Sequence, residues 1–194
     1  MIGRVAVAVM LAARIAAGAG GAVKGTATGP TGPARDAVVL IEGPSLRASE
    51  GAPHVVVDQR NETFMPHVVA VPAGTTVDFP NHDTVLHNVF SGSPAKKFNL
   101  GMYGGGETRS VTFDTPGIVR VDCDVHPRME AFVVVHTNPY AAVTDANGSY
   151  TISGLPPGSY LLRVWHETLA EQRVPLVIHD GQVETRDVRL SSPR

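Results

Sequence analysis

The chain has 194 residues, 16 basic and 18 acidic, with a formal net charge of −2. That length suits one domain or two small ones, and its 20 glycines and 15 prolines favour strands and turns over long helices. A near-neutral charge without a basic block excludes a protein that binds nucleic acid through a basic surface.

The N-terminus, residues 1–22, predicts a cleavable signal peptide. Arg4 supplies a basic start, Val5–Ala13 is an apolar run, and cleavage after Ala19 or Ala22 fits the small residues that follow. We therefore expect a periplasmic or secreted protein with no membrane span in its mature form. An uncleaved tail is the alternative interpretation.

Short Val-rich runs bounded by Gly and Pro predict an all-β chain. Three segments follow the signal peptide: N-terminal strands in 23–53, a domain in 54–137 and a further β module in 138–194. Residues 91–106 are expected to be irregular. The strands expected around the central motifs are residues 37–41, 54–58, 64–71, 75–79, 110–113, 118–123 and 131–136.

The only cysteine lies at the inward-facing end of the expected strand 118–123 and opens the motif Cys123-x2-His126-x2-Met129. In an exported protein a single cysteine indicates an intermolecular disulfide, a buried thiol or a metal ligand. A thiolate, an imidazole and a thioether in one short turn suit copper better than other common metals. The motif therefore predicts a mononuclear copper site.

Such a site needs a second histidine from elsewhere in the chain. His87, 36 positions before Cys123, is the best candidate, and His82 in the same loop is its rival. Two imidazoles and a thiolate give a trigonal plane, with a methionine sulfur as the long axial ligand. Met65 and His67 are candidates for an accessory copper contact, with a packing role as the alternative.

These motifs resemble the cupredoxins of the plastocyanin and amicyanin type. The matching features are Asn81-x-Asp83-x3-His87-Asn88-Val89, Pro116-Gly117-Ile118-Val119 and Cys123-x2-His126-x2-Met129, and the short gap before Met129 is most similar to the amicyanin loop. The resemblance implies a Greek-key β-sandwich, a type 1 (blue) copper ion and single-electron exchange with redox protein partners through the edge of His126. By this resemblance the ligands of the one copper ion are His87, Cys123, His126 and Met129. The resemblance also implies that Asn88 ties its loop to the backbone beside Cys123.

A more specific resemblance is to exported cupredoxin-like proteins that are labelled as methylamine-utilisation proteins. In that group, too, a segment ending in Val-Trp-His follows the copper motif, here Val164-Trp165-His166. The label does not establish methylamine metabolism for this chain.

The C-terminal segment resembles the carboxypeptidase regulatory-like, transthyretin-like β-sandwich. The matching motifs are Thr144-Asp145-x2-Gly148-x-Tyr150 and Gly154-Leu155-Pro156-Pro157-Gly158-x-Tyr160. The first strands of such a module are missing before Thr144 but match residues 23–41. We therefore expect a module split between 23–50 and 140–194, with the copper domain inserted; a separate tail domain is the alternative.

Together these patterns predict an exported electron carrier that is not an enzyme. No Gly-x-Ser-x-Gly motif of a hydrolase is present, and Ala170 stands where a zinc-protease motif starting at His166-Glu167 needs its second histidine. Two alternatives remain open: copper storage or delivery without electron transfer, and a structural or interaction module with a vestigial metal site.

Overall fold

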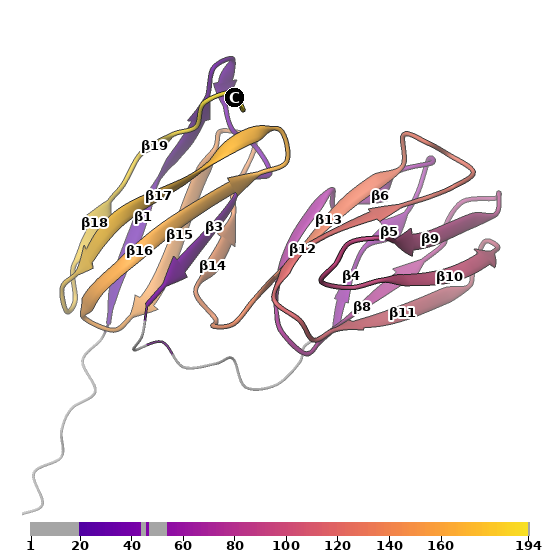
Figure 1. Cartoon of the computed structure of the whole chain (residues 1–194), viewed down its shortest axis with the longest axis horizontal. Coiled ribbons are helices and arrows are strands. Elements are labelled where there is room, and N and C mark those ends of the chain that lie inside the picture. Colours follow the sequence, from indigo (N-terminus) through magenta and orange to yellow (C-terminus); the bar gives the residue numbers. More distant parts are fainter. Residues whose placement is uncertain (1–19, 44–45, 47–53, 194) are drawn as a thin grey trace, which may run out of the picture.

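The computed structural model describes residues 20–43, 46 and 54–193. These residues form strands and turns in two β-sandwich-like domains that lie side by side (Figure 1), which confirms the all-β prediction. We call residues 54–137 the central domain, and residues 20–43 together with 138–193 the outer domain. Among the described residues, no helix has the length and hydropathy that a bilayer span requires.

The central domain consists of two sheets with strand orders β10-β9-β12-β13-β7 and β11-β8-β4, and a small ribbon of β5 and β6. Pairing is antiparallel except for β13 with β7 and β4 with β8. Its strands are β4 (His54–Val56), β5 (Asp58–Gln59), β6 (Phe64–Met65), β7 (Val68–Pro72), β8 (Thr75–Pro80), β9 (His87–Ser91), β10 (Phe98–Tyr103), β11 (Thr108–Phe113), β12 (Gly117–Asp122) and β13 (Glu130–His136).

Alternating burial explains why these segments pair as a sandwich. Along β8 the side chains of Thr75, Val77 and Phe79 are buried while their neighbours are half-buried, the period-2 pattern of a strand that covers a core. Phe64, Phe79 and Phe113 are almost completely buried in that core. Burying each such side chain contributes about 1.5–3 kcal/mol, so the core holds the loops at the sandwich end in place.

Strand β10 lies inside the segment that the sequence predicts as irregular, so that prediction was wrong. β10 pairs with β9, but its register shifts between Asn99 and Met102. Gly101 there has a φ of 70°, a conformation that glycine adopts readily. The irregularity breaks the alternation of buried and exposed residues, which hid the strand from a search for period-2 patterns.

The outer domain contains a sheet of order β14-β3-β16-β17 and a second sheet in which β1 is flanked by β15 and β18, with β2 and β19 also paired to β1. Its core includes Val23, Ile41, Leu155, Leu162 and Ile178. Its strands are β1 (Gly21–Gly29), β2 (Gly32–Pro33), β3 (Val38–Glu42), β14 (Ala141–Val143), β15 (Ser149–Leu155), β16 (Gly158–His166), β17 (Leu169–Ile178), β18 (Val183–Thr185) and β19 (Val188–Arg189).

N-terminal and C-terminal strands alternate in both outer sheets. β3 lies between β14 and β16, and β1 lies between β15 and β18. The strands that flank the Asn147-Gly148 turn, β14 and β15, pair with β3 and β1 rather than with each other. The Ala27 amide donates to the Gly148 carbonyl at 2.8 Å, so this turn docks on β1. Residues 21–42 therefore complete the sheets of a domain whose other strands follow residue 140.

The start of β1 bears on the signal-peptide prediction, most of which lies outside the described residues. β1 begins at Gly21, and the Ala22 amide donates to the Gln182 carbonyl at 2.8 Å. Cleavage after Ala19 would leave β1 whole, whereas cleavage after Ala22 would shorten it. The cleavage site itself stays a prediction.

A small apolar cluster joins the two domains. Val38 and Leu40 of β3 contact Val68 and Val134 of the central domain, and Trp165 packs beside this group. The rings of Trp165 and Phe132 lie 5.4 Å apart between centroids. Because side chains of both domains are buried here, the contact resists independent movement of the domains.

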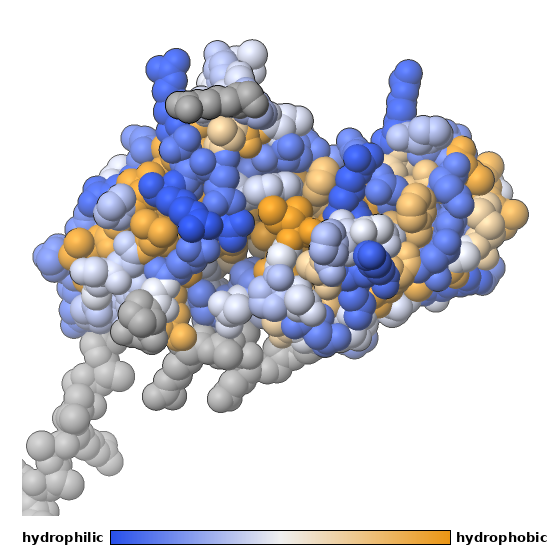
Figure 2. Space-filling model, in the orientation of Figure 1, coloured by the Kyte–Doolittle hydropathy of each residue, from blue (hydrophilic) through white to orange (hydrophobic). Residues whose placement is uncertain are grey.

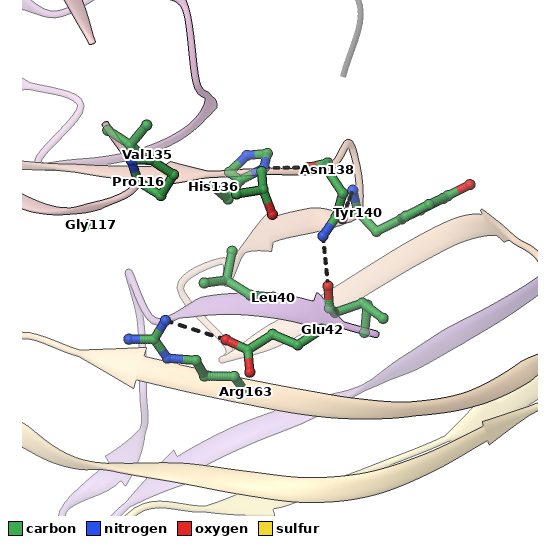
Figure 3. A pocket seen from close by; sticks show the side chains of 11 residues that line it. Leu40, Glu42, Pro116, Gly117, Val135, His136, Asn138, Tyr140 and Arg163 are labelled. Atoms are coloured by element: carbon green, nitrogen blue, oxygen red, sulfur yellow. Dashed lines mark hydrogen bonds and ion pairs between the residues drawn. The ribbon is translucent and has the colours of Figure 1, made fainter. Parts of the chain in front are cut away.

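A cavity of about 210 Å³ lies at the same junction (Figure 3). The Asn138 side chain donates to the Ile41 carbonyl at 2.9 Å, and Arg163 forms an ion pair with Glu42 at 3.5 Å. His136 is buried beside it and contacts the Asn138 carbonyl. These contacts fix the chain where it returns from the central domain to the outer domain.

Candidate metal centre

The loop between β12 and β13 holds Cys123, His126 and Met129. The Cys123 amide donates to the Met129 carbonyl at 3.2 Å, and the Met129 amide donates to the His126 carbonyl at 2.8 Å. The flanking strands pair in register up to Asp122 and Glu130. Cys123 is 4% exposed and Met129 1% exposed, so the loop is a closed turn whose two sulfur side chains point into the core.

His87 reaches the same place from the first position of β9. The loop before it is held by Asn81, whose side chain donates to the Val85 carbonyl at 3.0 Å and to the Tyr103 carbonyl at 3.1 Å. Tyr103 pairs with His87 across β10 and β9. Anchored at both ends, the His87 side chain is completely buried.

Three donor atoms converge at the end of the sandwich. The Nδ1 atoms of His87 and His126 are 3.0 Å apart, and Cys123 Sγ lies 4.0 Å from the first and 3.8 Å from the second. Among the described residues, this is the group of His, Cys, Asp or Glu donors close enough to hold one metal ion.

The triangle has the size of a metal site. A first-row ion in a trigonal plane, about 2.0 Å from each nitrogen and about 2.3 Å from the sulfur, separates its donors by roughly 3.5–3.7 Å. The observed separations lie within about half an ångström of that range. A thiolate with two imidazoles is the donor set of a blue-copper centre, so the residues fit a type 1 copper ion.

Comparison with protein families agrees with this geometry. Residues 52–136 match the family of copper binding proteins described as plastocyanin/azurin. The central domain is a cupredoxin domain. Residues 115–191 match the carboxypeptidase regulatory-like domain, so the chain combines the two domain types that its sequence motifs resemble.

The two matches overlap over residues 115–136. In the structure β12 and β13, which lie in this overlap, belong to the cupredoxin sheet, whereas β1 and β3 supply the strands that complete the outer domain. The strands before residue 44 are therefore structurally part of the outer domain, although the family match does not include them.

Parts of the chain are similar to solved structures of copper proteins and cupredoxins. An amicyanin mutant in its reduced Cu(I) form at pH 4 is 27% identical, over 50% of this chain and 98% of that protein, with a TM-score of 0.40. A purple cupredoxin from Nitrosopumilus maritimus is 26% identical, over 44% of this chain and all of that one, with a TM-score of 0.38.

A copper-containing nitrite reductase from Thermus scotoductus SA-01 is 28% identical over 49% of this chain, with a TM-score of 0.41, and the match spans only a quarter of that protein. No curated protein matches the chain.

Both histidines of the cupredoxin site have their Nδ1 atom turned inward. His87 Nε2 is 2.8 Å from the Asp83 carboxylate, so in the neutral ring Nε2 carries the hydrogen and Nδ1 keeps its lone pair. Burial raises the pKa of Asp83, but hydrogen bonds from the Glu62 amide, His87 and the Asn61 amide outweigh it and hold this pKa below its usual value. The site therefore has a metal-binding lone pair and an ionised carboxylate behind it.

In the sequence Asp83 stands only as part of a motif, and no role was predicted for it. Its place four residues before His87, in a loop between strands, is the one signal that could have identified it. The Glu62 carboxylate is 3.9 Å from His126 Nε2, but no sequence motif points to a role of Glu62 at the site.

Asn88 makes a different contact from the one that the resemblance implies. Its amide nitrogen donates to the Asp124 carboxylate at 3.1 Å, and its buried oxygen has no hydrogen-bond partner among the described residues. Asp124 directly follows Cys123, and its carboxylate accepts the Asn88 hydrogen bond in place of the backbone. The asparagine still connects the His87 strand with the Cys123 loop.

The other candidate residues lie outside the triangle. His82 is half-exposed and its Nδ1 is 2.6 Å from Asp58. His67 is 3.0 Å from Glu167 of the outer domain, and Met65 is 52% exposed. His82 and His67 thus contact carboxylates away from the triangle. Met129 lies in the same core cluster as Cys123, and its role as axial ligand stays a prediction.

Proposed function

We propose that the chain is an exported type 1 copper protein that carries single electrons between redox partners. The observation that carries this proposal is the triangle of His87, Cys123 and His126 at the end of a plastocyanin/azurin-family domain. Met129 is the proposed axial ligand.

The ligand residues are held so that they need little rearrangement. Cys123 and Met129 are bridged by backbone hydrogen bonds within one turn, and His87 is fixed by β9 and by Asp83. A bound copper ion supplies one-electron cycling between Cu(I) and Cu(II). Because the protein holds these donors in place, little rearrangement would accompany a change between Cu(I) and Cu(II).

The exposed edge of His126 is the proposed route for the electron. The His126 side chain is 25% exposed, whereas that of His87 is completely buried. Val125 beside it is 46% exposed, and Leu86 before His87 is 56% exposed. Apolar surface is visible at this end of the cupredoxin domain in Figure 2, and a redox protein that docks there would lie against the ligand ring.

The arrangement of the site favours electron transfer over substrate chemistry. The thiol of Cys123 is buried, and the donors face one another rather than a substrate cavity. We propose that the protein is an electron carrier rather than an enzyme, and that its signal-like N-terminus directs it to the periplasm or the exterior.

The test is an optical spectrum of the purified protein after addition of Cu(II). An intense visible thiolate-to-copper band that ascorbate bleaches, and that is missing in Cys123→Ser, supports the proposal. A colourless protein that holds copper tightly would indicate storage or delivery instead. A protein that binds no copper would indicate a structural or interaction role.

A further inference from the structure

One carboxylate joins a ligand histidine of the cupredoxin site to a neighbouring loop. Asp83 Oδ2 accepts a hydrogen bond from His87 Nε2 at 2.8 Å and one from the Glu62 amide at 2.9 Å. Asp83 Oδ1 accepts a hydrogen bond from the Asn61 amide at 2.5 Å. The Asp83 amide itself is fixed by the Asn81 side chain at 2.9 Å. Asp83 is therefore a rigid acceptor between a ligand histidine and a neighbouring loop.

That neighbouring loop has an unfavourable backbone conformation. Asn61 and Glu62 are consecutive non-glycine residues with φ values of 55° and 53°. Residues with side chains rarely adopt this left-handed region, and they persist there when the surroundings hold them. The two amides that donate hydrogen bonds to Asp83 belong to these two residues, so the carboxylate stabilises the strained turn.

The strained turn brings Glu62 to the second histidine. Glu62 Oε1 lies 3.9 Å from His126 Nε2, on the side of the ring that faces away from Cys123. Glu62 also lines a surface hollow together with Val125, His126 and Arg128. A change at Asp83 is thus transmitted to both ligand histidines, directly to His87 and through the turn to His126.

We propose that Asp83 is the positioning residue of the copper centre, which fixes the tautomer and orientation of His87 and places Glu62 beside His126. This inference rests on the proposed copper function. A carboxylate behind a ligand imidazole makes the ring a better donor and favours the more highly charged Cu(II). Asp83 therefore lowers the reduction potential of the bound copper.

The first test compares Asp83→Asn with the wild type and with Asp58→Asn. Asp58→Asn is the matched control, because the Asp58 carboxylate also contacts a histidine ring, that of His82, but this ring lies outside the metal triangle. Asp83→Asn should weaken Cu(II) affinity about 10–100-fold, the usual effect of losing such a partner. If Cu(I) affinity falls tenfold less than Cu(II) affinity, the potential rises by about 59 mV. Asp58→Asn should leave affinity, potential and visible spectrum unchanged.

The second test uses the metal-free wild-type protein and does not depend on how a variant folds. ¹⁵N NMR should show the His87 proton on Nε2, and the Asn61 and Glu62 amides should exchange slowly with solvent. A proton on Nδ1, or fast exchange of both amides, would overturn the inference.

Equal copper affinity and potential in Asp83→Asn and the wild type would also overturn it, as would equal changes in both aspartate variants. A wild type that binds no copper refutes the proposed function, while the NMR test still decides whether Asp83 holds His87.

Discussion

The dependence of the outer domain on N-terminal strands predicts a large effect of Ile41→Ala. Ile41 lies in β3, is completely buried, and belongs to the same core as Leu162 and Ile178, more than a hundred residues later. The substitution removes three buried carbons, worth roughly 2.4 kcal/mol at 0.8 kcal/mol each. The cavity left behind adds to this, so the loss is about 3 kcal/mol, within the usual 2–5 kcal/mol.

Differential scanning calorimetry and hydrogen exchange measure this loss. For a domain of 60–100 residues, 1 kcal/mol corresponds to about 4–8 °C, so the outer-domain transition should fall by roughly 12–24 °C. Amides of β16, which pairs with β3, should lose protection. Val177→Ala, at a 44% exposed position of β17, is the control and should change stability by about 0.5 kcal/mol or less. If Ile41→Ala affects the outer domain no more than this control, β3 is not part of its core.

Two further predictions concern the histidines. His87→Ala should abolish the visible copper band. His82→Ala should leave copper titrations unchanged, because the His82 ring contacts Asp58 outside the triangle. The opposite pattern would make His82 the ligand. Burial lowers the pKa of His136 from 6.5, against a smaller opposing effect of its hydrogen bond to the Asn138 carbonyl. As the pH falls, the unfolded chain binds a proton at His136 before the folded chain does. The stability that His136 contributes is therefore present above about pH 6.5 and is lost as the pH falls toward the lowered pKa of the folded protein. Urea unfolding at about pH 7.5 and 5.5 should show a smaller stability loss in His136→Gln than in the wild type, and equal losses would contradict this cause.

The all-β fold and the residues of the candidate site were predictable from the sequence because both depend on local patterns. Alternating residues identified β8 and β12, and a thiol, an imidazole and a thioether within seven residues indicated the metal and placed its loop. The structure brings His87, Cys123 and His126 together. Choosing His87 over His82 required the family motif, since both lie in one loop.

Features that depend on tertiary contacts were missed or misread. A break in register at Gly101 hid β10. The partners of β14 and β15 are β3 and β1 from the N-terminal segment, and the Asn-Gly turn between these strands does not reveal such distant partners. Asp83 received no role because a carboxylate in a loop has no pattern of its own. Its importance became visible only when the structure placed its oxygens beside His87 and the turn at Asn61.

The most direct test of the central claim is the absorption spectrum of the copper-loaded protein before and after ascorbate. We expect an intense visible band from the Cys123 thiolate bound to Cu(II), which disappears on reduction, returns on reoxidation and never forms in Cys123→Ser. A Cu(II)-bound wild-type protein with no such band, or a band that persists in Cys123→Ser, would contradict the claim that Cys123 is a ligand of a type 1 copper centre.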